Sequence, residues 1–262
     1  MLRNLFQQIP LIRRFVAVEN EPFSFLPDEV LEDDVFITSY PKSGNTWVRF
    51  LLANALHPDR GVNFHSIQDL VPEVGKSEED NRFPPYPRLL KSHAPYKEEY
   101  GRTIYILRDG RDVYVSYYYY LQKDKSMSFD EFLIDTDHWP STWGEHVEGW
   151  LDAYDRGESV LLVRYEDLKT SPETELNRML SFIGIDSISQ GKIYQAVANS
   201  SFESMRQIEN EKGRPYSKSG RFVRKGKKSD WQTLFTHAAK KAFKRREGDV
   251  LVRAGYATDK SW

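Results

Sequence analysis

The chain has 262 residues, and 37 Lys and Arg against 39 Asp and Glu give it a formal net charge of −2. A chain of this length suits a single α/β domain with its own hydrophobic core. It contains no Cys, which excludes disulfides, a thiolate nucleophile and a thiolate-held metal, and is typical of a reducing compartment. The near-neutral charge excludes a protein that coats a polyanion with its whole surface. No run of 18 apolar residues occurs, so we expect a cytoplasmic protein without a transmembrane segment.

Residues 1–33 precede the first predicted strand, and we interpret them as an N-terminal arm on a single domain formed by residues 34–262. The first 18 residues carry three Arg and no acid, so a targeting or membrane-surface helix is the alternative. Pro10 interrupts that pattern and no clean cleavage site follows it. These features favour an arm that docks on the domain.

Four short runs have the unbroken hydrophobicity of strands that are buried on both faces of a sheet. Helical patterns fall between and after them, with apolar residues at i, i+3, i+4 and i+7 from Val48 and a Thr142-x-x-Glu145 capping box. This alternation predicts a mostly parallel sheet with helices on both faces. The Pro-rich segment 58–88 is predicted to be an irregular surface excursion over the sheet edge. The predicted strands are 35–40, 89–92, 103–107 and 160–165.

The first predicted strand runs directly into a helix through the sequence Tyr40-Pro41-Lys42-Ser43-Gly44-Asn45-Thr46-Trp47. A turn of small residues at a helix N-terminus offers free backbone N–H groups and the positive end of the helix dipole to an anion. Lys42 adds a positive charge, and two hydroxyl groups follow it. The spacing is not that of a Walker A loop, because the Lys precedes the Gly. These residues alone leave open whether the turn is an anion site or only a well-capped helix start.

A second candidate anion site follows the third predicted strand. The chain there reads Arg108-Asp109-Gly110-Arg111-Asp112, with Ser116 further along the next helix. Two guanidinium groups and a hydroxyl suit an anion, and the alternative is a turn in which Arg111 pairs with a neighbouring Asp. Since parallel strands end at one edge of a sheet, two anion sites there imply a ligand with phosphates at two positions.

Four segments occur in the order and spacing of one family: PKSGNTW, LRDGRDVYVSYY, VRYEDLK and FVRKGKKSDW. Over about residues 34–231 the chain therefore resembles the sulfotransferases that use 3′-phosphoadenosine 5′-phosphosulfate (PAPS). The resemblance implies a P-loop NTPase-like α/β domain. It also implies direct in-line transfer of a sulfuryl group to the hydroxyl of a small-molecule alcohol or phenol, less often to an amine, with adenosine 3′,5′-bisphosphate (PAP) as product. We expect no metal, because the chain lacks Cys and a spaced cluster of His and carboxylates.

The resemblance also implies roles for individual residues. Lys42 would neutralise the leaving phosphate, which the loop around it would hold, and Asn45, which replaces a frequent Thr, still carries a donor. Arg108 and Ser116 match the ligands of the 3′-phosphate, and Tyr165 matches a contact of the adenine. The implied donor-binding residues are Lys42, Ser43, Gly44, Asn45, Thr46, Trp47, Arg108, Ser116, Tyr165, Ser200, Phe202, Met205, Arg224, Lys225 and Gly226.

The segment Lys91-Ser92-His93 resembles the K-[TS]-H element of the family at the end of a strand. His93 would take the proton of the attacking acceptor, and an imidazole with a pKa of about 6.5 suits that task at neutral pH. Lys91 would lie near the bridging oxygen of the donor. The implied catalytic residues are therefore His93, Lys42 and Lys91, and the remaining five histidines have no such context.

The sequence does not identify the acceptor. Aromatic residues in segments that border the acceptor pocket in this family suit an apolar alcohol, although core packing accounts for most of them. Residues 212–228 hold eight Lys and Arg and no acid, which we interpret as a lid over the nucleotide rather than a nucleic-acid patch. Residues 232–241 depart from the dimer motif of the family, so monomer and homodimer both stay open, as do an ATP-dependent small-molecule kinase and a catalytically silent nucleotide-binding protein. The aromatic candidates are Phe83, Tyr86, Phe129, Trp139 and Trp143.

Overall fold

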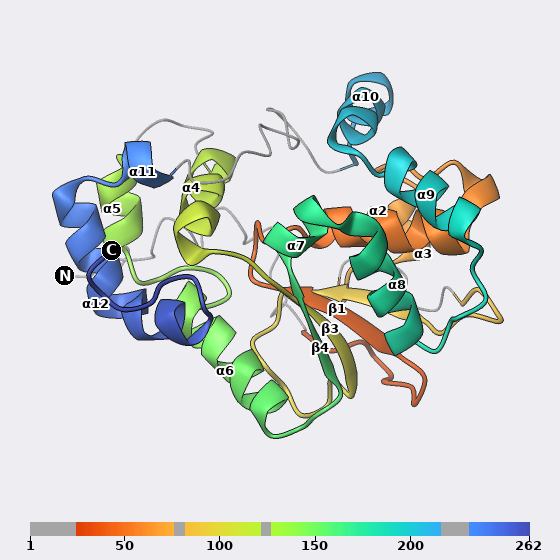
Figure 1. Cartoon of the computed structure of the whole chain (residues 1–262), viewed down its shortest axis with the longest axis horizontal. Helices are drawn as coiled ribbons and strands as arrows, with labels where there is room; N and C mark the ends of the chain where they lie inside the picture. Colours follow the sequence, from red (N-terminus) through yellow and green to blue (C-terminus); the bar gives the residue numbers. More distant parts are fainter. Residues whose placement is uncertain (1–24, 76–81, 122–126, 216–230) are drawn as a thin grey trace, which may run out of the picture.

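The structure is a computed structural model that describes residues 25–75, 82–121, 127–215 and 231–262 (Figure 1). Its strands form one parallel sheet in the order β2-β1-β3-β4, so Ile37 of β1 lies opposite Lys91 of β2 and Ile104 of β3. The four predicted strands are confirmed to within one residue at each end. Their bounds are β1 (Val35–Ser39), β2 (Leu89–Ser92), β3 (Arg102–Leu107) and β4 (Val160–Arg164).

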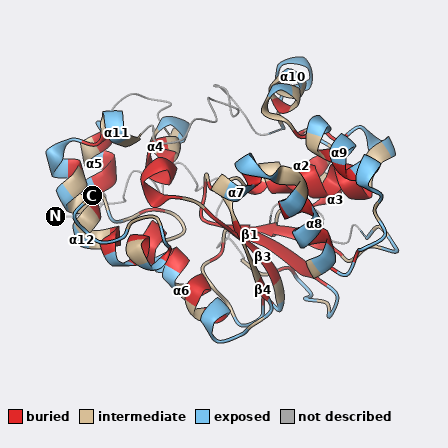
Figure 2. Ribbon diagram, in the orientation of Figure 1, coloured by how far each residue is buried: buried red, intermediate tan, exposed pale blue. Residues whose placement is uncertain are grey.

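Helices cover both faces of this sheet, as predicted, and alternate strand residues enter two separate cores. Ile37 and Ile104 pack under α2, α8 and α9, whereas Phe36 and Tyr105 pack under α4, α6 and α12. Figure 2 shows most strand residues and the inward sides of these helices buried. The helices are α2 (Asn45–Leu56), α3 (Ile67–Leu70), α4 (Gly110–Leu121), α5 (Phe129–Ile134), α6 (Trp143–Asp155), α7 (Tyr165–Thr170), α8 (Pro172–Phe182), α9 (Gln190–Asn199), α10 (Phe202–Lys212), α11 (Trp231–Leu234) and α12 (His237–Arg253), with a 3₁₀ turn at Pro58–Arg60. Among the described helices, none combines the length and apolar character needed to cross a bilayer.

The predicted surface excursion is wrong in part. Described residues of segment 58–88 do pass over the β2 edge, where the Lys91 N–H donates to the Pro72 carbonyl, but they also enter the core. Phe64 and Ile67 are buried and pack with α2. The count of prolines signalled irregular backbone correctly, but it carried no information on the apolar residues between them.

The start of α6 is held by the predicted capping box. The Glu145 N–H donates to the Thr142 hydroxyl at 3.3 Å, and the Glu145 carboxylate accepts from the Thr142 N–H at 3.0 Å. These two bonds satisfy free donors of the first turn and fix where the helix begins. The residues that follow on one face, Trp143, His146 and Trp150, are all fully buried.

The first residue of α4, Gly110, lies against the buried indole of Trp143. A Cβ added to Gly110 would lie 2.6 Å from Cδ2 of that ring, which has no room to move. We expect Gly110→Ala to lower the free energy of unfolding by about 1–3 kcal/mol, because the methyl overpacks the core. Urea denaturation measures the change. Gly101→Ala is the control, since nothing lies within 4 Å of the added carbon, and equal unfolding energies for the two variants would contradict the packing.

Candidate active site

The turn between β1 and α2 has left-handed backbone at two residues, Lys42 with φ 69° and Gly44 with φ 107°. The backbone N–H groups of Gly44, Asn45 and Thr46 donate to no other described residue. They stand at the N-terminus of the 12-residue helix α2, where the helix dipole is positive. Three free donors on a left-handed turn form the kind of concavity that holds a phosphate.

Tyr165, the first residue of α7, joins this turn to two other predicted site residues. A Cβ at Gly44 would lie 2.8 Å from its ring, so the loop backbone passes directly over the tyrosine. The Trp47 ring meets the same tyrosine edge-on with centroids 5.8 Å apart, and the Arg108 guanidinium lies 4.3 Å from the tyrosine centroid. The structure thus brings Gly44, Trp47, Arg108 and Tyr165 into one cluster.

Arg108 keeps an unused hydrogen-bond donor beside the loop. Its Nη1 donates to the Lys42 carbonyl at 2.9 Å, while its buried Nε has no partner among the described residues. An orphaned guanidinium donor of this kind fits an anionic ligand. Ser116 is half-buried on α4, the helix that follows Arg108 after a short turn.

Arg111, by contrast, is occupied. Its guanidinium pairs with the Asp109 carboxylate at 2.6 Å and lies 4.4 Å and 4.6 Å from the centroids of Trp231 and Trp262. The salt-bridged alternative is therefore the correct interpretation of Arg111, and only Arg108 is left as the guanidinium for an anion at this strand end.

His93 follows the last residue of β2, beside the end of β1. Its Nδ1 lies 2.7 Å from the carbonyl oxygen of Ser39. Because a carbonyl only accepts, Nδ1 carries the proton and Nε2 keeps its lone pair. The imidazole meets Trp139 edge-on at 5.9 Å, and Trp139 stacks on Phe25 at 6.1 Å. The imidazole that carries Nε2 therefore lies beside the stacked rings of Trp139 and Phe25.

The two predicted catalytic lysines have different surroundings. The Lys42 ammonium lies 4.1 Å from the ring centroid of Tyr120 on α4. The Lys91 ammonium lies 2.6 Å from the Glu73 carboxylate, and both of these side chains are largely buried. Lys42 thus stands in the turn between β1 and α2, whereas Lys91 is held at the outer edge of β2 by an ion pair.

Other predicted donor-binding residues have side chains turned into the protein. The Ser200 hydroxyl is fully buried and accepts from Asn54 at 3.0 Å, and the Asn45 amide donates to the Ile37 carbonyl at 2.9 Å. The remaining donor of Asn45 for a phosphate is its backbone N–H. Met205 is buried against the α2 layer and Phe202 is half-buried beside it. Ser43 is buried within the loop, and Arg224, Lys225 and Gly226 lie outside the described residues.

The five aromatic candidates separate clearly. Trp139 is the one beside His93. Trp143 and Phe129 belong to the hydrophobic core. Phe83 and Tyr86 pack on His57, which follows the C-terminal end of α2. A helix of 12 residues is about 18 Å long, so these two rings lie about that far from the loop at the other end of α2. The sequence could not tell which of these aromatic residues lies beside His93 and which belong to the core, because that depends on tertiary packing.

The sequence analysis missed a second histidine. His146 is fully buried, and its Nε2 lies 3.2 Å from the main-chain oxygen of His93. The sequence feature that could have singled out His146 is its position on the apolar face of α6, the helix whose start the capping box fixes.

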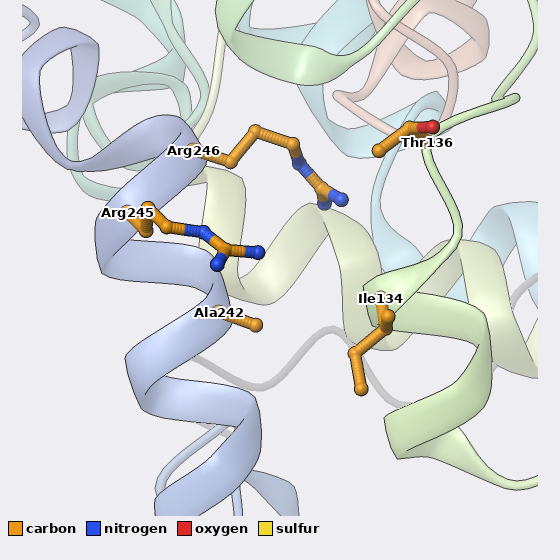
Figure 3. Close-up of a pocket in the computed structure, with 5 residues that line it drawn as sticks. All are labelled: Ile134, Thr136, Ala242, Arg245 and Arg246. Carbon is orange, nitrogen blue, oxygen red and sulfur yellow. The ribbon is translucent and has the colours of Figure 1, made fainter.

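A cavity of about 280 Å³ lies elsewhere, between α5 and α12, with Arg245 and Arg246 reaching toward it (Figure 3). Figure 1 places these two helices on the opposite side of α4 from α2. Arg246 is paired with the buried Glu247 at 2.6 Å, and the cavity lies apart from the turn between β1 and α2. Within the described ranges, no group of three His or carboxylate side chains is placed to hold a metal ion.

The contact between Gly44 and Tyr165 yields a direct test of the loop. We expect Gly44→Ala to weaken PAP binding at least about tenfold, because the new methyl meets the ring and φ 107° disfavours an L residue. Calorimetric titration measures the affinity. Gly61→Ala, which has φ 57° and open space around the added carbon, isolates the backbone effect and should leave binding unchanged. Wild-type affinity in Gly44→Ala would contradict the loop as an anion site.

Comparison with known proteins identifies the family. A family model for the sulfotransferase domain matches residues 32–251. Bovine sulfotransferase 1A1 is 31% identical over 264 residues, covering 90% of this chain and 88% of that protein, and rabbit amine sulfotransferase is 29% identical over 247 residues, covering 83% and 80%. The crystal structure of a mouse sulfotransferase complexed with PAP is 25% identical with a TM-score of 0.67, covering 87% of this chain and 91% of that chain. The free loop donors and Arg108 fit such a nucleotide, and the chain belongs to the PAPS-dependent sulfotransferase family, whose enzymes transfer a sulfuryl group from PAPS.

Proposed function

We propose that this enzyme sulfates the hydroxyl of a small apolar alcohol or phenol, with His93 as the general base. The observation that carries the proposal is the 2.7 Å contact between Nδ1 of His93 and the Ser39 carbonyl. In the neutral ring this contact makes Nε2 the unprotonated nitrogen, at the end of the strand next to the phosphate loop. A general base needs an unprotonated nitrogen within reach of the acceptor proton.

The proposed step balances without a further reactant. The acceptor oxygen forms a bond to sulfur, and its proton passes to Nε2 of His93. The bond between sulfur and the bridging oxygen breaks, and its electron pair stays on the 5′-phosphate. Lys42 and the free N–H groups of the loop would stabilise the charge that develops on that phosphate. Lys91 would add a second cation near the bridging oxygen once its ammonium turns from Glu73.

The nucleotide would extend from the loop toward the ends of β3 and β4. Arg108, with its orphaned Nε, and Ser116 on α4 would hold the 3′-phosphate, while Tyr165 and Trp47 offer aromatic surface for the adenine. Phe202 and Met205 would complete the adenine wall together with the backbone at Ser200. We retain Arg224, Lys225 and Gly226 as proposed ligands of the 3′-phosphate on the strength of the sequence motif alone.

The acceptor would lie on the other side of the loop, against Trp139 and Phe25. A planar or apolar body packed on these rings would bring its hydroxyl to His93. An amine is the second candidate acceptor, because a relative that covers most of the chain is an amine sulfotransferase. A screen of phenols, aliphatic alcohols and amines with sulfur-labelled PAPS separates the two classes.

The base assignment is tested by His93→Gln. We expect kcat to fall by about 10²–10⁴-fold while PAP affinity stays at the wild-type value, because the base contributes to the chemical step and not to nucleotide binding. Steady-state kinetics and PAP titration measure the two quantities. The exposed His237→Gln is the matched control and should keep full activity. Wild-type turnover in His93→Gln would show that another group takes the proton.

The role of Arg108 is tested by nucleotide discrimination. We expect Arg108→Gln to weaken PAP binding by about 10–100-fold and to leave AMP, which lacks the 3′-phosphate, within about threefold, because a charged hydrogen bond is lost to one ligand only. Arg111→Gln is the control, since its guanidinium is bound to Asp109 and its loss should affect both nucleotides equally. Equal losses for PAP and AMP in Arg108→Gln would remove the 3′-phosphate assignment.

A further inference from the structure

A second histidine supports the turn that carries His93. His146 on α6 is fully buried, with Nε2 at 3.2 Å from the main-chain oxygen of His93 and Nδ1 at 2.9 Å from the Tyr105 hydroxyl. Since a carbonyl oxygen only accepts, Nε2 of His146 is the protonated nitrogen. Nδ1 must then accept, so the Tyr105 hydroxyl donates to it.

Both groups are held in one protonation state at neutral pH. Burial lowers the pKa of His146 to about 4, so its ring carries a single proton. Burial also raises the pKa of Tyr105 well above its ordinary value, so its hydroxyl keeps the hydrogen that it donates. The hydrogen bonds therefore run in one direction, from Tyr105 to His146 to the carbonyl of His93.

The rings in this chain have little freedom to move. Tyr105 on β3 stacks on His146 with centroids 5.7 Å apart and on Trp150 at 5.1 Å. Trp150, one turn further along α6, donates its indole N–H to the Ala94 carbonyl at 3.2 Å. Two residues of one helix thus bind two successive carbonyls, those of His93 and Ala94, at the turn after β2.

We infer that His146 is a positioning residue for the sulfuryl transfer: it fixes the main chain of His93, so that the His93 ring stays on the Ser39 carbonyl with Nε2 presented to the acceptor. The inference rests on the proposed role of His93 as base. His146 is fully buried and touches neither acceptor nor donor, so it acts through His93. Loss of the hydrogen bond from His146 should lower the rate of transfer strongly, because a displacement of about 1 Å at a reacting group costs about a hundredfold in rate.

A merely structural role for His146 would change stability and leave the chemistry alone. A positioning role predicts instead that kcat depends on a donor at the position of Nε2. The terminal amide of Gln can place an N–H at that position, whereas Leu fills similar volume without any donor. Comparison of His146→Gln with His146→Leu therefore isolates the hydrogen bond from the packing.

We expect His146→Leu to lower kcat by about 10–100-fold and His146→Gln by no more than about threefold, with PAP affinity within twofold of wild type in both. Tyr105→Phe, which removes one oxygen atom from the same chain, should lower kcat by about 3–10-fold. Tyr114→Phe is its matched control, because this buried hydroxyl donates to Glu247 at 2.9 Å and not to the His93 network. It should cost stability and leave kcat unchanged.

Two results would overturn the inference: wild-type kcat in folded His146→Leu, or equal kcat losses in the Leu and Gln variants. Where His146→Leu fails to fold, Tyr105→Phe decides, and wild-type kcat in that variant rejects the positioning chain. His93→Gln, measured alongside, separates this failure from failure of the proposed function. If His93→Gln is inactive while Tyr105→Phe and His146→Leu turn over normally, only the role of His146 is wrong, whereas a fully active His93→Gln rejects the base itself.

Discussion

One hydrogen bond, from Nδ1 of His93 to the carbonyl of Ser39, joins the two halves of the site. It connects the residue that follows β2 to the last residue of β1, from which the phosphate loop departs. This bond is possible because the two strands are parallel neighbours whose carboxyl ends meet at one edge. The same bond fixes the tautomer of the imidazole, so the location of the proposed base and the nitrogen that it would offer have a single structural cause.

The strand order β2-β1-β3-β4 determines where the other residues of the proposed site lie along the edge of the sheet. One element of the proposed site follows the carboxyl end of each strand: His93 after β2, the loop after β1, Arg108 after β3 and Tyr165 after β4. The loop therefore lies between the proposed base on one side and the cluster around Tyr165, the proposed nucleotide site, on the other. Tight packing keeps this arrangement in place, since the Tyr165 ring leaves no room for a side chain at Gly44.

Much of this could be predicted from local sequence. Buried parallel strands appear as unbroken apolar runs, and Gly44, which tolerates left-handed backbone, stands directly before a helix start. The capping box at Thr142 and Glu145 gave the start of α6 correctly. These features depend on residues close together in the chain, where spacing and chemistry determine the conformation.

Other features depend on contacts between distant residues and could not be predicted. Two such features arise only when separate segments pack together. They are the burial of Ser200 against Asn54 and the contacts of the Arg111 guanidinium with the rings of Trp231 and Trp262. His146 was the most informative omission, because a lone His on an apolar helix face is as compatible with plain core packing as with a role beside the base. Its carbonyl partner is 53 residues away, and no periodicity within α6 marks that partner.

The central claim, that the Ser39 carbonyl sets the tautomer of the base, is tested most directly by the ¹⁵N chemical shifts of the imidazole nitrogens in the complex with PAP at neutral pH. A two-bond ¹H–¹⁵N correlation spectrum resolves the two nitrogens, and loss of the signal in His93→Gln assigns it. The account predicts a proton on Nδ1 and a bare Nε2. A proton on Nε2 with a bare Nδ1 would contradict it, because the nitrogen offered to the acceptor would then be unable to take its proton.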